Sequence, residues 1–359
     1  MAGSGPLGVA IVGCGNISRG YARTMAAHPN EIRLVGCFDI QPQAAQALAA
    51  EFPCRVYKNL IELTKDAAVE AVVNLTIHDA HVNVTTACLK AGKHVHSEKP
   101  LAMDARSAAR MAALAKKKKV RLSAAPITFM GECQQTAWKM IRENKLGTVR
   151  VAYAEMNWGR IENWHPNPAP FYKVGALFDI GVYPLTVLTT ILGPVKRVMG
   201  FGKVVWPDRT SKSGQKFRLK TPDWMCGYLE FASGPIARLT ASFYVGPTKQ
   251  HGIEFHGDTA TLHLSTAHDF NGKVQLRMFG SNDWIEQPLA KAPYPGVEWA
   301  RGLTELHNAI RTDRPHRASA EQAVHVVEIV EGIYKAARRG RPVAIKSKFK
   351  APAPMDWAM

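Results

Sequence analysis

A glutamate and a lysine stand next to each other at the end of a candidate strand, in the stretch 93–100, which reads Lys-His-Val-His-Ser-Glu-Lys-Pro. Pro100 lacks a backbone donor and ends the strand, so Glu98 and Lys99 fall where the chain turns. Charged groups at the carboxyl end of a parallel strand lie where open α/β sheets bind their ligands. Glu98 and Lys99 are therefore candidates for a ligand-binding site, and the alternative is a surface salt bridge at a strand end.

A second pair of reactive groups follows later in the chain. Asp179 and Tyr183 stand four residues apart in the stretch 175–192, which is predicted to be a helix. Residues at this spacing share one face of a helix. An acid and a phenol on one face can relay a proton. The alternative for Asp179 is an acid that complements the positive end of the helix dipole.

The glycines near the start predict a phosphate-binding turn between a strand at 7–12 and a helix at 17–27. Gly13 and Gly15 open a G-x-G-x-x-G pattern in which Ser18 takes the third place. The first glycine allows the tight turn, the second lets a pyrophosphate approach the backbone, and the third position only needs to be small. N–H groups at the start of the helix then face the phosphates. The residues expected to contact a dinucleotide here are Gly13, Gly15, Asn16 and Ile17.

Asp39 ends the second predicted strand, 32–38, and stands 26 residues after Gly13. This is close to the expected position of the acid that binds the ribose hydroxyls of a dinucleotide. A carboxylate there repels a 2′-phosphate, and no arginine or lysine follows at once, so NAD is favoured over NADP. The alternative is that Asp39 caps the helix that begins near Pro42.

Further strands and helices continue the alternation up to residue 124. The predicted strands are 55–57, 69–75, 93–97 and 120–124, and the predicted helices are 60–65, 79–91 and 104–116. Strands separated by helices predict right-handed βαβ units and a parallel sheet. Thr76 and His81 follow the strand 69–75, at the edge where the cofactor binds. Thr76 is expected to contact the cofactor, whereas His81 either contacts it or packs at the start of a helix.

The pattern changes near Pro126, where a helix at 131–144 and a strand at 149–158 precede an irregular segment, 159–172. This segment is rich in proline and aromatic residues, and long loops of this kind are uncommon unless functional. Aromatic faces with polar groups suit sugars or polyols, and a lid or a subunit contact is the alternative. The expected substrate wall consists of Trp158, His165 and Tyr172.

Closely spaced strands dominate the rest of the chain, at 195–205, 224–231, 236–245, 253–256, 260–264 and 274–278. Their turn residues predict an antiparallel sheet with one face covered by helices. An exposed excursion is expected at 207–220, closing helices at 296–311 and 319–337, and an edge strand at 342–345. The fold class is therefore α/β, with a parallel-sheet domain at 1–125 and an α+β domain with an open, mostly antiparallel sheet at 126–359.

The composition restricts the class of protein. With 359 residues, 46% of them hydrophobic and 21% charged, the chain is globular and long enough for two domains. No apolar run reaches the length of a membrane span or a secretion signal, so a cytoplasmic location is expected. The six cysteines have no zinc-site spacing, so no metal and buried thiols are expected. The net charge of +17 has its one dense run at Lys116–Lys119, which predicts a solvated helix end and no nucleic-acid surface.

Taken together, these motifs resemble the Gfo/Idh/MocA family, named after glucose–fructose oxidoreductase and inositol dehydrogenase. The features that carry the resemblance span nearly the whole chain. They are the glycine turn at 13–18, the stretch 91–100 with its Glu-Lys-Pro, the stretch 175–183, and 323–325 in the closing helix. Two departures stand out. Lys173 and Val174 precede Gly175 where the family often has glycines, and Tyr183 replaces a frequent histidine, as in the branch that resembles glucose–fructose oxidoreductase, dihydrodiol dehydrogenase and xylose dehydrogenase.

The resemblance implies a Rossmann domain that holds NAD(P), oxidation or reduction of sugars or polyols, and a homo-oligomer, a dimer or tetramer, formed through the second sheet. We expect Lys99 to move the hydroxyl proton, because burial and a positive nicotinamide would favour its neutral form. Asp179 would orient the lysine or the substrate, Tyr183 would hold the proton, and Glu98 would anchor the cofactor or the lysine loop. Lys99, Asp179 and Tyr183 would also contact the substrate, and Lys99 the cofactor.

The predicted activity is NAD-dependent transfer of a hydride to or from a carbinol carbon of a sugar, glycoside or polyol. Two alternatives stay open. One is a glycosidase that uses bound NAD to oxidise the sugar transiently. The other is a non-catalytic regulator that binds the cofactor.

Overall fold

The computed structural model describes residues 5–359 and contains two compact units. The first unit runs to Ile127 and adds Glu298–Val324, and the second comprises Thr128–Val297 and His325–Met359. The predicted boundary at residue 125 separates the same two sheets, but it leaves the segment 298–324 with the second domain. In the structure this segment packs in the first unit, where Trp299 lies against Tyr21 with ring centroids 5.7 Å apart.

The first unit contains a six-stranded sheet in the order β3-β2-β1-β4-β5-β6, and every pair is parallel. Its strands are β1 (Leu7–Val12), β2 (Ile32–Phe38), β3 (Arg55–Val56), β4 (Ala71–Asn74), β5 (His94–Ser97) and β6 (Leu122–Ala124). The order reverses between β1 and β4, and this switch point is where open α/β sheets bind ligands. The expected α/β class and parallel sheet are confirmed.

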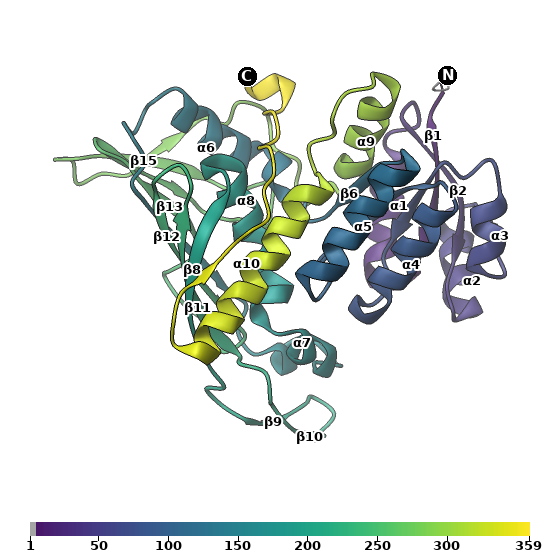
Figure 1. Cartoon of the computed structure of the whole chain (residues 1–359), viewed down its shortest axis with the longest axis horizontal. Helices are drawn as coiled ribbons and strands as arrows, with labels where there is room; N and C mark the ends of the chain where they lie inside the picture. The colour runs from purple at the N-terminus through teal and green to yellow at the C-terminus, as the bar shows by residue number, and fades with distance from the viewer. Residues whose placement is uncertain (1–4) are drawn as a thin grey trace. The chain divides into compact units, whose positions relative to one another are not determined.

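Helices cover the strands of this sheet. They are α1 (Asn16–Ala26), α2 (Pro42–Glu51), α3 (Leu60–Lys65), α4 (His78–Lys90), α5 (Ala105–Lys118) and α9 (Arg301–Arg311). Side chains such as Met25 of α1, Leu48 of α2 and Leu303 of α9 form one apolar cluster with β1 and β2. Helices α4 and α5 lie side by side (Figure 1). Because β1 is covered on both faces, all six of its residues are buried, which explains its continuous apolar sequence.

The second unit contains a nine-stranded sheet in the order β16-β15-β14-β13-β7-β12-β11-β8-β17. Its strands are β7 (Val151–Asn157), β8 (Val195–Lys203), β11 (Trp224–Phe231), β12 (Ile236–Ser242), β13 (Gly252–His256), β14 (Ala260–Leu264), β15 (Val274–Met278), β16 (Ile285–Gln287) and β17 (Val343–Ala344). Only β7 and β12 pair in parallel, so the expected mostly antiparallel sheet is confirmed.

One face of this sheet is covered by helices. The longer helices are α6 (Glu132–Arg142), α8 (Val182–Leu192) and α10 (Ala320–Arg339), and the single turns are η1 (Thr128–Met130) and η4 (Asp356–Ala358). Helix α10 lies along β8 and β11 (Figure 1). Its Ile333 fits against two glycines, Gly200 and Gly227, where an added Cβ would come within 2.4 and 2.6 Å of it. Small residues on these strands therefore let the helix approach closely.

Two segments differ from the sequence-based expectation. The segment 159–172, expected to be irregular, contains η2 (Ile161–Asn163) and the start of α7 (Ala169–Val174). The excursion at 207–220 forms a hairpin of β9 (Asp208–Thr210) and β10 (Lys216–Arg218). Arg209 of this hairpin is buried, because it is part of an ion-pair cluster described below. The spacing of apolar residues in the sequence predicts neither the short helices nor the hairpin.

Two negative findings concern the described residues. No helix within residues 5–359 is long and apolar enough to cross a membrane. The same residues contain no group of three or more His, Cys, Asp or Glu side chains that could hold a metal ion.

The six cysteines are free thiols, and five of them are buried. The peptide bonds Lys99–Pro100 and Ala125–Pro126 are cis.

Candidate active site

The turn after β1 has the geometry that its glycines predict. Gly13 has a φ of +95°, and an added Cβ would come within 2.6 Å of the Leu75 carbonyl carbon in the turn after β4. Its N–H donates to the Phe38 carbonyl of β2 at 2.9 Å. Only glycine combines this backbone conformation with this close approach. The turn is thereby fixed between the two neighbouring strands of the switch point.

The next residues leave open space at the start of α1. Gly15 and Asn16 are exposed, and an added Cβ on Gly15 would meet nothing within 4 Å. Ser18 is fully buried and its Oγ donates to the Gly15 carbonyl at 2.6 Å, so a small residue is needed there. Ile17 is half-buried and packs against the apolar cluster. The free N–H groups and the open space fit a pyrophosphate.

The Asp39 carboxylate joins the turns after β1 and β2. Its Oδ2 accepts from the Cys14 N–H at 2.7 Å and its Oδ1 from the Gln41 N–H at 2.8 Å. Helix α2 begins at Pro42 after Gln41, and no side chain caps it, so the capping alternative is not what the geometry shows. Among residues 5–359 each oxygen accepts one hydrogen bond, which leaves acceptor capacity for ribose hydroxyls. These residues fit NAD.

A buried network holds Glu98 in place. Tyr21 of α1 donates from Oη to Glu98 Oε1 at 2.8 Å, and the Lys99 N–H donates to Oε2 at 2.9 Å. His96 Nε2 lies 3.3 Å from the same Tyr21 Oη, and its Nδ1 lies 2.9 Å from Ser123 Oγ. Burial lowers the pKa of His96 to about 3, so this ring is neutral. The helix that follows the glycine turn is thus linked directly to the Glu-Lys pair.

His81 connects the ends of β4 and β5. It is 1% exposed, with Nδ1 2.8 Å from the Pro100 carbonyl and Nε2 2.9 Å from the Thr76 carbonyl. Thr76 in turn donates from Oγ1 to Asn74 Oδ1 at 2.7 Å. Since both ring nitrogens face backbone carbonyls, the geometry favours the packing alternative for His81. Contacts of Thr76 and His81 with a cofactor stay predictions.

Asp179 and Tyr183 lie in the second unit, at the start of α8. A π-helical turn, η3 (Leu177–Gly181), leads into α8, and Asp179 lies within it. Both side chains are buried. Single π-helical turns are frequent at functional sites. The apolar spacing of this stretch predicts a helix correctly, but it gives no indication of the π-turn.

Two rings, those of Trp158 and His268, lie beside Tyr183. The Trp158 ring lies with its centroid 6.4 Å from that of Tyr183, 6.1 Å from that of Trp164 and 5.9 Å from that of His268. His268 is also 6.0 Å from Tyr183. We call Trp158, Trp164, Tyr183 and His268 the aromatic cluster. Of the predicted wall residues, Trp158 is a member, and His165 extends it through Trp164, 5.7 Å away.

Tyr172, the third predicted wall residue, is part of a buried ion-pair cluster. Its Oη donates to Glu162 Oε2 at 2.5 Å, and Arg209 Nη1 donates to Glu162 Oε1 at 2.7 Å. Arg209 also pairs with Asp223, whose side chain is fully buried. Burial and Glu162 raise the pKa of Tyr172. Burial opposes the charged form of Glu162, but bonds from Tyr172 and Arg209 outweigh it and lower its pKa.

This ion-pair cluster fastens the segment 159–175 to the β9–β10 hairpin. The Arg209 guanidinium also lies 5.3 Å from the Tyr172 ring centroid and 5.7 Å from that of Trp206. Tyr172 therefore holds the segment 159–175, which we call the wall segment, with its hydroxyl. Its contact with a substrate stays a prediction. No sequence motif points to a role for Tyr21, Arg209 or His268. Arg209 is the single basic residue in the run 206–210, and this isolated charge is the one signal that could have indicated any of the three.

Comparisons with known proteins identify the family of both domains. Residues 7–125 match the family model described as an oxidoreductase family with an NAD-binding Rossmann fold, and residues 134–263 match the GFO/IDH/MocA C-terminal domain. The D-glucoside 3-dehydrogenase of Escherichia coli K12 is 27% identical over 95% of this chain and 98% of its own length. The trans-1,2-dihydrobenzene-1,2-diol dehydrogenase of Mus musculus is 26% identical over 65% of this chain and 67% of its own length.

A solved structure is similar over nearly the whole chain. The WlbA dehydrogenase of Bordetella pertussis, in complex with NADH and UDP-GlcNAcA, covers 95% of this chain and 99% of its own, with a TM-score of 0.79 at 20% identity. This likeness concerns the fold.

The fold and the matches define an oxidoreductase with an NAD-binding Rossmann domain. The chain belongs to the Gfo/Idh/MocA family. The predicted class of enzyme, a dehydrogenase, and the predicted cofactor, NAD, are confirmed at the level of the family.

Proposed function

We propose that this protein transfers a hydride between NAD and a carbinol carbon of a sugar, glycoside or polyol. The observation that supports this most is the aromatic cluster, in which Trp158 and His268 lie beside the buried ring of Tyr183 and Trp164 lies beside Trp158. Aromatic faces with nearby hydrogen-bonding groups suit the apolar faces and hydroxyls of a sugar ring. The named relatives act on a glucoside and on a cyclic diol, which are both ring alcohols.

The proposal assigns the proton transfer to Lys99 and Tyr183. Bound NAD supplies the carbon that accepts or releases the hydride. When an alcohol is oxidised, its hydroxyl proton must leave, and Lys99 in its neutral form would take it. Tyr183 would hold the substrate oxygen, and the buried Asp179 would orient these groups. Glu98 fixes the backbone of Lys99 through the bond from its N–H.

The test is to identify any nucleotide released from the purified protein and to measure NADH formation with a panel of aldoses, inositols and glycosides. Steady NADH formation with one group of substrates is the expected result, and it defines the substrate class. Bound NAD with glycoside cleavage but no net NADH would replace the proposal by transient oxidation. A protein without nucleotide and without turnover would contradict it.

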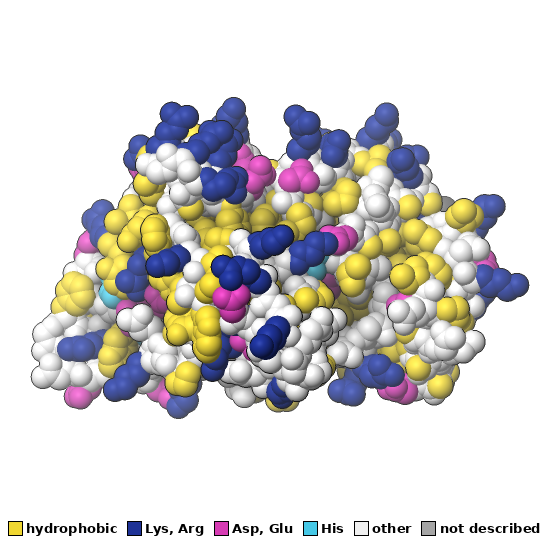
Figure 2. All heavy atoms as spheres, turned by 90° about the horizontal axis from the view of Figure 1, so that it is seen from below, with side chains coloured by type: hydrophobic (Ala, Val, Ile, Leu, Met, Phe, Trp, Pro, Cys, Tyr) yellow, Lys and Arg dark blue, Asp and Glu magenta, His cyan; other side chains and the backbone are white. Residues whose placement is uncertain are grey.

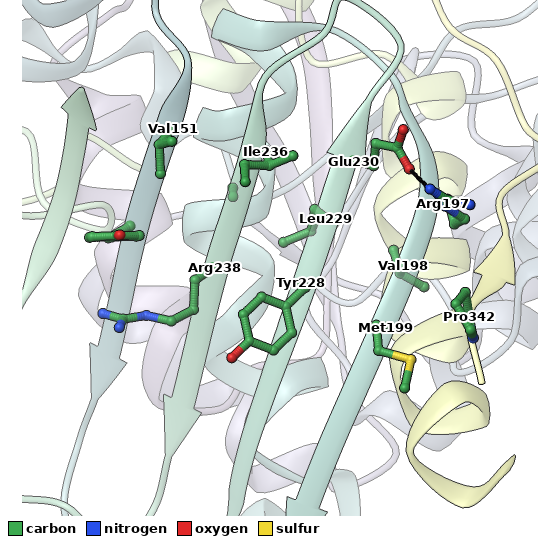
Figure 3. Close-up of a pocket in the computed structure, with 12 residues that line it drawn as sticks. Val151, Arg197, Val198, Met199, Tyr228, Leu229, Glu230, Ile236, Arg238 and Pro342 are labelled. Atoms are coloured by element: carbon green, nitrogen blue, oxygen red, sulfur yellow. Dashed lines mark hydrogen bonds and ion pairs between the residues drawn. The ribbon is translucent and has the colours of Figure 1, made fainter. Parts of the chain in front are cut away.

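We also propose that two or more copies assemble through the open face of the second sheet. Tyr228 and Ile236 on this face are 57% and 54% exposed, and they belong to neighbouring strands. Figure 3 shows Tyr228, Arg238 and Met199 on three adjacent strands. These three residues line a hollow of about 810 Å³. We call Met199, Tyr228, Ile236 and Arg238 the open-face patch. Exposed apolar groups on a sheet are typical of interfaces between subunits.

The variant Tyr228→Lys should weaken this assembly, because it buries a charge in the proposed interface. Its mass in solution, measured by light scattering across a range of concentrations, should approach that of one chain. The variant Lys90→Glu, at the exposed end of α4, should keep the wild-type mass. A wild-type protein that is monomeric at every concentration would contradict the proposal.

A further inference from the structure

His268 is a histidine beside Tyr183 to which neither the sequence motifs nor the proposed proton transfer gives a role. It lies in the loop between β14 and β15, and its ring centroid is 6.0 Å from that of Tyr183 and 5.9 Å from that of Trp158. Both contacts are edge-on, and the side chain is half-buried. The imidazole of His268 and the phenol of Tyr183 therefore both lie against the ring of Trp158.

The loop that carries His268 is held firmly against α6. Gln134, which is 1% exposed, donates from Nε2 to the carbonyls of Thr266 and Asp269 at 3.1 and 2.8 Å. These two carbonyls flank His268 in the chain. Cys133 adds bonds from its N–H to the Phe270 carbonyl and from its Sγ to the Asp269 carbonyl. A buried amide that bonds two neighbouring carbonyls restricts the loop, so the position of the ring is set in advance.

The hydrogen bonds of Thr266 occupy one of the two ring nitrogens of His268. Thr266 Oγ1 accepts from the His268 N–H at 3.2 Å and lies 3.1 Å from Nδ1. With the Thr266 hydroxyl as the donor to Nδ1, the hydrogen of the neutral ring is on Nε2. Burial lowers the pKa of His268, which keeps the ring neutral. Among residues 5–359 no hydrogen bond to Nε2 is found, so this nitrogen can bond a ligand.

We propose that His268 binds the substrate, donating from Nε2 to an oxygen of the sugar or polyol that lies against Trp158 and Tyr183. This inference rests on the proposed function and extends it. Trp158 would contact the apolar face of the ring, while Tyr183 holds the reacting oxygen. His268 then selects substrates with a second oxygen in the matching position. A pocket that donates to a hydroxyl discriminates strongly against the analogue that lacks it.

The first experiment compares His268→Phe and His268→Gln with the wild type. Phenylalanine keeps the ring but not the donor, whereas glutamine keeps a donor. We expect His268→Phe to lower kcat/KM by about 10- to 100-fold, mostly through KM, and His268→Gln to recover part of the loss. The dissociation constant of NAD, measured by fluorescence titration, should not change. The matched control is His251→Phe, which changes an exposed histidine directly before β13. This variant should keep wild-type kinetics.

The second experiment uses singly deoxygenated analogues of the best substrate. With the wild type, one analogue should have a kcat/KM that is lower than that of the parent substrate by the same factor as His268→Phe lowers kcat/KM for the parent. With His268→Phe, that analogue should show no further decrease. The inference would be overturned if the effects of His268→Phe and of deoxygenation on kcat/KM multiplied for every analogue, or if His268→Phe had the kcat/KM of the wild type. Either result would leave the proposed function intact. A wild type that oxidises no alcohol would overturn both.

Discussion

The position of Lys99 depends on side chains that are distant in sequence. Glu98 bonds the Lys99 N–H with one oxygen and the Tyr21 hydroxyl with the other. Tyr21 is itself packed against Trp299, and its hydroxyl lies beside the neutral His96. The lysine backbone is therefore fixed by the helix that follows the glycine turn. This link joins the proposed cofactor turn to the proposed catalytic lysine.

Replacing Lys99 by methionine tests its proposed role. The variant keeps the apolar stem but cannot accept a proton, so turnover should fall by about two to four orders of magnitude. The NAD dissociation constant should stay within a few-fold of the wild type, because the glycine turn and Asp39 are untouched. Near-normal turnover in Lys99→Met would show that another group moves the proton. Lys90→Met, on an exposed turn of α4, provides the control.

Which residues could be predicted depends on how local their interactions are. The roles of Gly13, Ser18 and the position of Asp39 follow from a strand, a turn and a helix that are contiguous in sequence. The bond between Tyr21 and Glu98 joins residues 77 positions apart, and His268 is about as far from Tyr183. Hydrophobic spacing describes Tyr21 only as a core residue. Its polar partner becomes visible only when the sheet brings α1 and β5 together.

At the scale of elements, the wall segment 159–175 is held by a charge cluster. Arg209 neutralises Glu162 and Asp223, and the exposed fractions of the three side chains are 1%, 6% and 0%. Unpaired charges at this depth would be strongly unfavourable. The cluster therefore ties the β9–β10 hairpin, the wall segment and the start of β11 into one structure.

Replacing Arg209 by methionine should destabilise this structure. The change leaves two buried carboxylates without their cation, so the free energy of unfolding should fall by about 3–5 kcal/mol. Arg218→Met removes an exposed pair with Asp208 in the same hairpin and should cost less than about 1 kcal/mol. Chemical denaturation of both variants gives the comparison. Equal effects of the two changes would contradict a stabilising role of the buried cluster.

The elements themselves were largely predictable, because apolar periodicity and turn residues mark β1, β11, α4 and α10. The π-turn at Asp179 and the helix α7 were not. A π-turn depends on one extra residue within otherwise helical spacing, and α7 contains six residues between prolines and a glycine. Short elements of this kind are stabilised by tertiary contacts, here the bonds of Tyr172.

At the scale of the whole molecule, the charge is strongly basic. The chain has 46 Lys and Arg residues against 29 Asp and Glu residues. Figure 2 shows the basic side chains spread over the face in view, with apolar and neutral surface between them. Such a field attracts anions without specificity, and this attraction weakens as salt is added. It accords with a negatively charged dinucleotide as cofactor.

Buried histidines should make the stability of the protein sensitive to acid. Burial lowers the pKa of His96 to about 3 and that of His325 to about 4, from an ordinary value of 6.5. Below pH 6.5 the unfolded chain takes up protons at these rings while the folded chain does not. Their contribution to stability is therefore full above pH 6.5 and is lost as the pH falls.

Each of these two histidines should lower the free energy of unfolding by up to about 2 kcal/mol between pH 6.5 and 5. Denaturation midpoints measured across this range should fall steadily. The variant His325→Gln should show a shallower slope than the wild type, whereas His251→Gln, at an exposed site, should not. A wild-type midpoint that is constant down to pH 5 would contradict the assignment of neutral buried rings.

The division into two units was also only partly predictable. Composition and length indicate two domains, but the return of residues 298–324 to the first unit depends on packing between Trp299, α9 and the first sheet. These contacts join segments about 280 residues apart, and no local pattern contains them.

The measurement that tests the central claim most directly is the mass of the NADH formed from a substrate deuterated at its carbinol carbons. Direct hydride transfer predicts NADH that is heavier by one deuterium and that appears in step with substrate oxidation. NADH without deuterium, or oxidation of the alcohol without reduction of NAD, would contradict the account.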